Sequence, residues 1–84
     1  MERQKIPFDS PIAIRAVQEN TVRHVNSVNG ASEVLTDWPH ARRGPVYQET
    51  VAVIEAALSG EVTASEARRA FHHFADHAGV LVRQ

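Results

Sequence analysis

The strongest constraint on the fold is a pair of helical segments joined by a very short connection. Apolar side chains recur at helical spacing over residues 47–58, and Gly60 suits the end of that helix. Thr63 and Glu66 have the spacing of a capping box, in which each side chain accepts a hydrogen bond from the other residue's amide. Because only two residues separate Gly60 from Thr63, the two helices are predicted to form an antiparallel helical hairpin.

The apolar positions of these two helices predict much of the core. The stripe of the first helix consists of Tyr47, Val51, Ile54 and Leu58. The buried positions expected in the second helix are Ala67, Ala70, Phe71, Phe74 and Ala78. Gly79 is expected to end this second helix.

A shorter helix is predicted upstream of the hairpin. Its apolar face comprises Ala31, Val34, Leu35 and Trp38, at positions i, i+3, i+4 and i+7. Asn29 is the expected N-cap, and Pro39 is expected to end the helix. After a loop, Pro45 suits the first turn of the next helix.

Two strands are predicted before the helices. Residues 12–17 alternate, with Ile12, Ile14 and Ala16 on one face, and residues 21–25 are rich in β-forming side chains. The polar residues 18–20 are expected to form the turn of an antiparallel hairpin. Val22 and Val25 would lie on opposite faces, so we expect a bulge or an early end near His24.

The chain is therefore predicted to be a single α+β domain of element order β-β-α-α-α, with the β-hairpin packed on three helices. Its 84 residues leave no room for a second core. Residues 1–7 are expected to form a flexible arm and residues 8–84 the domain. Residues 80–82 are too apolar for a free tail and are expected to dock on the core as a short third strand.

Several of these motifs resemble a family of small uncharacterised bacterial proteins, the domain of unknown function 982 family. The matching pieces are Trp38-Pro39, Gly44 with Tyr47, Ala57-Leu58-Ser59-Gly60, Glu66-Ala67-Arg68, Ala70-Phe71 and Ala78-Gly79. Thr50 and Ile54 stand where alanine and cysteine are more usual in that family. The resemblance implies no activity, cofactor or catalytic residue.

The loop before the second helix is the best candidate for contact with a ligand. Two arginines lie beside a helix N-terminus whose first amides lack intrahelical partners, a combination that can hold a phosphate or carboxylate. The candidate residues are His40, Arg42, Arg43, Val46 and Tyr47. In the alternative interpretation the loop is a solvated connector whose arginines face water or pair with Asp37 and Glu49.

Other residue patterns that could indicate a function give weaker signals. His73 and His77 have the i, i+4 spacing of zinc ligands, but both are expected at the surface, and no third ligand is evident, so no metal site is predicted. The two helices of the predicted hairpin do not fit a helix-turn-helix, because Glu66 stands where an apolar residue is needed. No nucleophile, phosphate-loop or paired-carboxylate motif occurs, so neither enzymatic activity nor a cofactor is expected.

Composition narrows the remaining function classes. The net charge of −1 argues against nucleic-acid binding, and no apolar window is long enough to cross a membrane. The absence of cysteine and of a signal peptide favours a cytoplasmic location. The leading hypothesis is a protein-interaction or regulatory module that forms a homodimer, because the hairpin edges carry no guarding lysine or proline within the strands. The alternative is a small-anion or nucleic-acid binder that uses Arg42 and Arg43.

Overall fold

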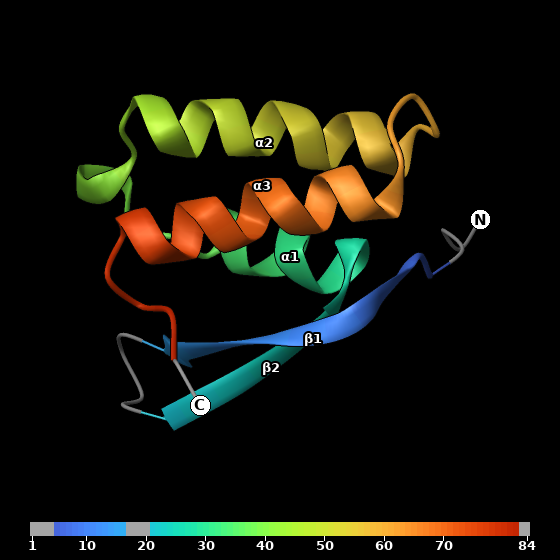
Figure 1. Ribbon diagram of the computed structural model, residues 1–84. Helices are drawn as coiled ribbons and strands as arrows, with labels where there is room; N and C mark the ends of the chain where they lie inside the picture. Colours follow the sequence, from blue (N-terminus) through green and yellow to red (C-terminus); the bar gives the residue numbers. More distant parts are fainter. Residues whose placement is uncertain (1–4, 17–20, 83–84) are drawn as a thin grey trace.

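The computed structural model describes residues 5–16 and 21–82, and it contains a two-stranded sheet followed by three α-helices (Figure 1). The elements in chain order are β1 (Pro7–Ala16), β2 (Thr21–Ser27), α1 (Val28–Thr36), the 3-10 helix η1 (His40–Arg42), α2 (Pro45–Leu58) and α3 (Ala64–His77). The predicted α+β class and the order β-β-α-α-α are confirmed. The predicted turn at residues 18–20 lies outside the described residues.

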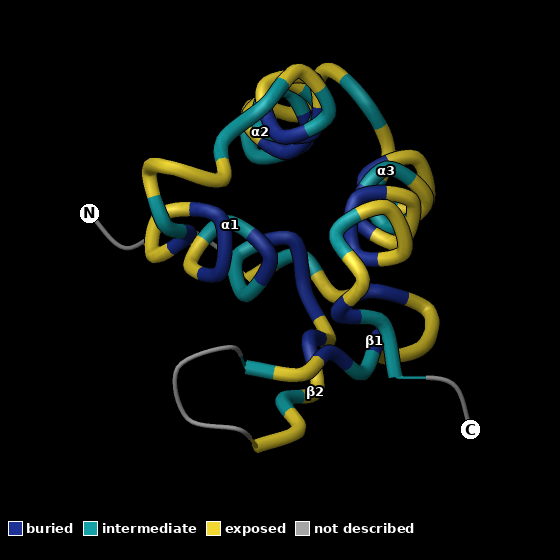
Figure 2. Tube along the Cα trace, turned by 90° about the vertical axis from the view of Figure 1, so that its left-hand side faces the viewer, coloured by how far each residue is buried: buried dark blue, intermediate teal, exposed yellow. Residues whose placement is uncertain are grey.

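The helices all lie on the same side of the sheet. Helix α1 packs on β2 and α3 packs on β1, while α2 lies across α1 and α3 on the side away from the strands (Figures 1 and 2). The core fills the space between these elements, and Ile12, Val25 and Phe71 are among its fully buried members. The opposite face of the sheet carries no helix in the described part of the chain (Figure 2).

The pairing of β1 with β2 is regular from Ala16 opposite Thr21 to Ile12 opposite Val25. The irregularity expected near His24 was wrongly placed: it lies between Pro7 and Ile12, where four residues of β1 oppose the single residue Asn26. Val25 is buried, whereas Val22 faces solvent with 46% of its surface exposed. The sheet therefore keeps its register by leaving one valine exposed rather than by distorting β2.

Helix α1 begins earlier than predicted. Ser27, not Asn29, is its N-cap, and the Ser27 hydroxyl accepts a hydrogen bond from the Gly30 amide at 3.0 Å. The Asn29 side chain instead accepts one from the Ile6 amide at 2.9 Å, and the Ile6 carbonyl accepts one from the Val28 amide at 2.8 Å. Within the expected arm, residues 1–4 lie outside the described residues, and Ile6 is tied to the start of α1.

The buried faces of α2 and α3 are rotated slightly from the predicted stripes. In α2 the buried residues are Tyr47, Thr50, Ile54 and Ala57, whereas Val51 and Leu58 are half-buried. In α3 they are Ala67, Phe71, Phe74 and Ala75, whereas Ala70 is half-buried, as is Ala78 just beyond the helix. The buried polar side chain of Thr50 is satisfied because its hydroxyl donates to the Val46 carbonyl at 2.8 Å.

The C-terminal segment docks on the outer edge of β1, as expected. The Arg15 amide donates to the Val80 carbonyl at 2.8 Å, and the Val82 amide donates to the Ala13 carbonyl at 2.9 Å. The contact is an isolated antiparallel bridge between Ile14 and Leu81 rather than a full strand. It nevertheless covers the middle of that edge.

Phe71 is the largest fully buried side chain, with none of its surface exposed. We expect Phe71→Ala to lower the free energy of unfolding by ~3–5 kcal/mol, because it leaves a cavity between α3 and the sheet. Phe71→Leu should cost less, since it preserves most of the volume. Chemical denaturation would measure both, and a loss below ~1 kcal/mol for the alanine variant would contradict this role in the core.

The start of α3 carries half of the predicted capping box. The Thr63 hydroxyl accepts from the Glu66 amide at 3.1 Å, whereas no described hydrogen bond joins the Glu66 carboxylate to the Thr63 amide. Thr63→Ala should therefore destabilise the protein by ~1 kcal/mol. Glu66→Ala should cost only a few tenths of that, from the helix dipole. Equal losses in thermal denaturation would show that the Glu66 side chain also acts as a cap.

Candidate functional site

The two arginines of the predicted loop have different environments. The Arg43 Nε donates to the Trp38 carbonyl at 3.1 Å, and its Nη2 donates to the Thr36 carbonyl at 3.0 Å. The Arg43 guanidinium also lies over the Tyr47 ring, 5.0 Å from the ring centre. Arg43 thus closes the C-terminal end of α1 and does not pair with Asp37 or Glu49.

Tyr47 is likewise engaged in holding the helices together. Its hydroxyl donates to the Leu35 carbonyl at 2.7 Å, and its ring packs edge-on to Phe74 with the ring centres 6.0 Å apart. Tyr47 is buried, so only part of its side chain can meet a ligand. The sequence predicts Tyr47 both as a core residue and as a ligand-contact residue. In the structure it is buried and also lines a pocket beside the loop.

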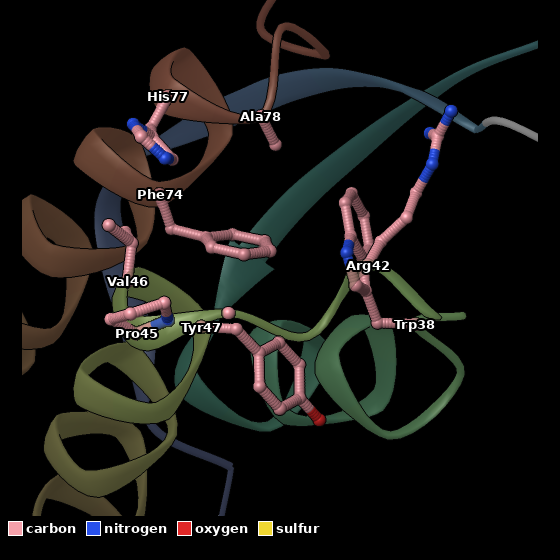
Figure 3. Close-up of a pocket in the computed structure, with 9 residues that line it drawn as sticks. Trp38, Arg42, Pro45, Val46, Tyr47, Phe74, His77 and Ala78 are labelled. Carbon is pink, nitrogen blue, oxygen red and sulfur yellow. The ribbon is translucent and has the colours of Figure 1, made fainter. Parts of the chain in front are cut away.

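A pocket of about 360 Å³ opens beside this loop (Figure 3). Three of the five predicted ligand-contact residues line it, namely Arg42, Val46 and Tyr47. His40 and Arg43 are not among its lining residues. The other lining residues are Trp38, Gly44 and Pro45 from the loop region, and Phe74, His77 and Ala78 from α3 and its end.

The residues from α3 were not predicted to belong to this site. Phe74 was expected only in the core and His77 only at the surface. They are about thirty positions from the loop, and nothing in their local pattern indicates that the end of α3 passes the start of α2. They join the site because α2 and α3 are antiparallel, which places the last turn of α3 beside the first turn of α2 (Figure 1).

The permanent charge of the pocket is positive and comes from Arg42. Arg42 and His77 are exposed, and no aspartate or glutamate is among the lining residues. Within the described part of the chain, no carboxylate pairs with either side chain. Gly44 is the N-cap of α2 and has no side chain with which to cap the helix. The first amide that donates a hydrogen bond within the helix is that of Gln48, and its acceptor is the Gly44 carbonyl. The amides of Val46 and Tyr47 therefore have no partner within the helix.

The histidine pair on α3 does not form a metal centre on its own. His73 and His77 are both exposed, and among residues 5–16 and 21–82 no group of three histidine, cysteine, aspartate or glutamate side chains is placed to hold an ion. His77 instead lines the pocket with Arg42.

A second surface is the free edge of β2. Since the Arg15 amide and the Ala13 carbonyl bond to the C-terminal segment, the backbone groups of Ala13 and Arg15 point away from β2. In an antiparallel pair, residues directly opposite share this orientation. Their partners are His24 and Val22, so the amides and carbonyls of these two residues point outward from β2.

Beside this edge runs an open groove of about 400 Å³ between β2 and the first turns of α1. It is lined by Lys5, by residues 23–27, and by Asn29, Gly30 and Glu33. Arg23 forms an ion pair with Glu33 at 3.1 Å, so the one charged side chain of β2 at neutral pH is already compensated. The edge is consequently accessible and close to neutral.

Comparison with known proteins identifies one family. The sequence model of the family described as "Protein of unknown function (DUF982)" matches residues 10–82. No curated protein and no solved structure matches the chain. None of the helices in the described part of the chain is long and apolar enough to cross a membrane.

The contrast between the two arginines of the loop can be tested directly. Arg43→Ala should lower the free energy of unfolding by about 2 kcal/mol, because it removes two charge-assisted hydrogen bonds to carbonyls at the end of α1. Arg42→Ala is the matched control and should change stability by less than about 0.5 kcal/mol, since Arg42 is exposed. Urea denaturation of both variants would measure this, and similar effects would contradict the assignment.

Proposed function

The chain belongs to the DUF982 family of proteins of unknown function, and we propose that it is a protein-interaction module that pairs with a second copy of itself through the open edge of β2. The proposal assigns no catalytic role to the chain and places it in the cytoplasm. It rests on how the two edges of the sheet differ.

The single observation that carries the proposal is that, within the described part of the chain, one edge of the sheet is covered and the other is not. Val80 and Val82 bond to the outward backbone groups of β1. The corresponding groups of Val22 and His24 on β2 bond to no other described segment of backbone. An unpaired row of amides and carbonyls is a template on which another strand can add.

A second copy is the partner that suits this edge best. Two antiparallel β2 strands related by a two-fold axis present the same groups to each other and extend the hairpin into a four-stranded sheet. β2 contains neither proline nor lysine, and the exposed Arg23–Glu33 ion pair within each copy lowers the repulsion between the arginines. Val22, whose side chain is exposed, would be partly covered by the added strand. A small domain gains stability from such additional burial.

The competing hypothesis is a binder of small anions or nucleic acid, and the positions of Arg42 and Arg43 favour the small anion. Arg43 is committed to the carbonyls of Thr36 and Trp38, which leaves Arg42 without the second cation that a nucleic-acid surface would need. The remaining observation in its favour is the pocket that Arg42 shares with His77. A small anion fits that pocket better than a nucleic acid does.

Self-association can be tested by removing one outward amide from β2. We expect sedimentation to give twice the 9.3 kDa mass of the chain for the unmodified protein and for His24→Ala, which keeps the backbone donor. His24→Pro removes the His24 amide, which does not bond to β1. This variant should therefore sediment as a monomer. Val22→Pro should act in the same way.

The controls separate loss of pairing from loss of folding. Circular dichroism should show an unchanged helix content in both proline variants, because the β1–β2 hydrogen bonds remain. A constant mass near 9.3 kDa for the unmodified protein across micromolar concentrations would refute the dimer. A folded proline variant that still dimerises would show that a different surface is used.

A further inference from the structure

The pocket beside η1 combines a charge of one sign with an aromatic wall. Figure 3 shows Phe74 lying between His77 on one side and Trp38 and Arg42 on the other. The Trp38 and Phe74 rings are in edge-to-face contact with their centres 4.9 Å apart. Polar groups therefore stand at the rim of the pocket and aromatic carbon lies at its base.

The walls of the pocket are held in place before any ligand arrives. The hydrogen bonds of Arg43 to the carbonyls of Trp38 and Thr36 tie the loop to α1, and the Tyr47 hydroxyl ties α2 to α1. Arg42, in contrast, makes no ion pair within the described residues and is free to turn toward a ligand. The rigid base reduces the ordering cost of binding, and the side chain of Arg42 is the part of the site that a ligand must order.

We propose that this pocket binds a small organic carboxylate with an aromatic or branched apolar body. The guanidinium of Arg42 can accept a carboxylate in a two-pronged contact. His77, on the other side of Phe74, is a second polar side chain at the rim. The apolar body would lie against the edges of Trp38 and Phe74.

The composition of the pocket favours a carboxylate over inorganic phosphate. Only one arginine is present, so there is no second permanent cation to balance a doubly charged group. Aromatic surface contributes nothing to a bare phosphate but stabilises a hydrocarbon group. The volume of about 360 Å³ also lies at the lower end of the range for small-molecule sites, which suits a ligand of roughly ten heavy atoms. None of the lining residues belongs to β2, so this site does not depend on self-association.

Trp38 provides a direct probe, because it is the only tryptophan in the chain. We expect benzoate and phenylacetate to shift the indole N–H resonance of Trp38 in a saturable way. Benzamide, which keeps the ring and lacks the charge, should bind at least about tenfold more weakly. Inorganic phosphate should also bind more weakly than benzoate.

Two substitutions locate the carboxylate. Arg42→Gln should weaken benzoate binding by about tenfold while leaving the protein folded, because Arg42 is exposed. Arg69→Gln, at an exposed position of α3 that does not line the pocket, should leave the affinity unchanged. The proposal is overturned if no saturable shift of the Trp38 resonance occurs, if benzamide or phosphate binds as tightly as benzoate, or if Arg42→Gln retains full affinity.

Discussion

The closure of the C-terminal end of α1 is the interaction on which the arrangement of the helices depends. A helix leaves its last carbonyls without intrahelical partners, and those of α1 lie where the chain turns into the core. Tyr47 and Arg43 satisfy three carbonyls in this region, those of Leu35, Thr36 and Trp38. Because Tyr47 lies in the first turn of α2, its hydrogen bond also fixes where α2 crosses α1.

From this junction the rest of the helical layer follows. With α2 held against α1, the antiparallel α3 brings Phe74 into edge contact with both Trp38 and Tyr47. The same crossing creates the pocket at the junction, since the loop before α2 and the end of α3 meet there. A residue that looks like a ligand contact in the sequence, Arg43, is thereby used for structure, whereas its neighbour Arg42 stays available for binding.

The sheet obeys a different constraint. Two strands alone are only marginally stable, so their apolar face must be covered by α1 and α3. The edges remain, and among residues 5–16 and 21–82 only the edge of β1 is covered, by the backbone of Val80 and Val82. The two binding surfaces proposed for the protein thus use groups that the described part of the chain leaves without an internal partner, namely the edge of β2 and the guanidinium of Arg42.

The sequence alone determined the element order, the short joint between α2 and α3, the docking of residues 80–82 and most of the buried apolar positions, because these depend on local periodicity and local end signals. It misassigned the N-cap of α1, the position of the strand irregularity and the burial of Val51 and Ala75, since each depends on which neighbour packs against it. Tertiary structure alone decided that Arg42 and His77 share a pocket while Arg43 turns inward. The physical reason is that a side chain's role depends on which unsatisfied backbone group lies within its reach, and the crossing of α1 and α2 brought those groups to Arg43 and Tyr47.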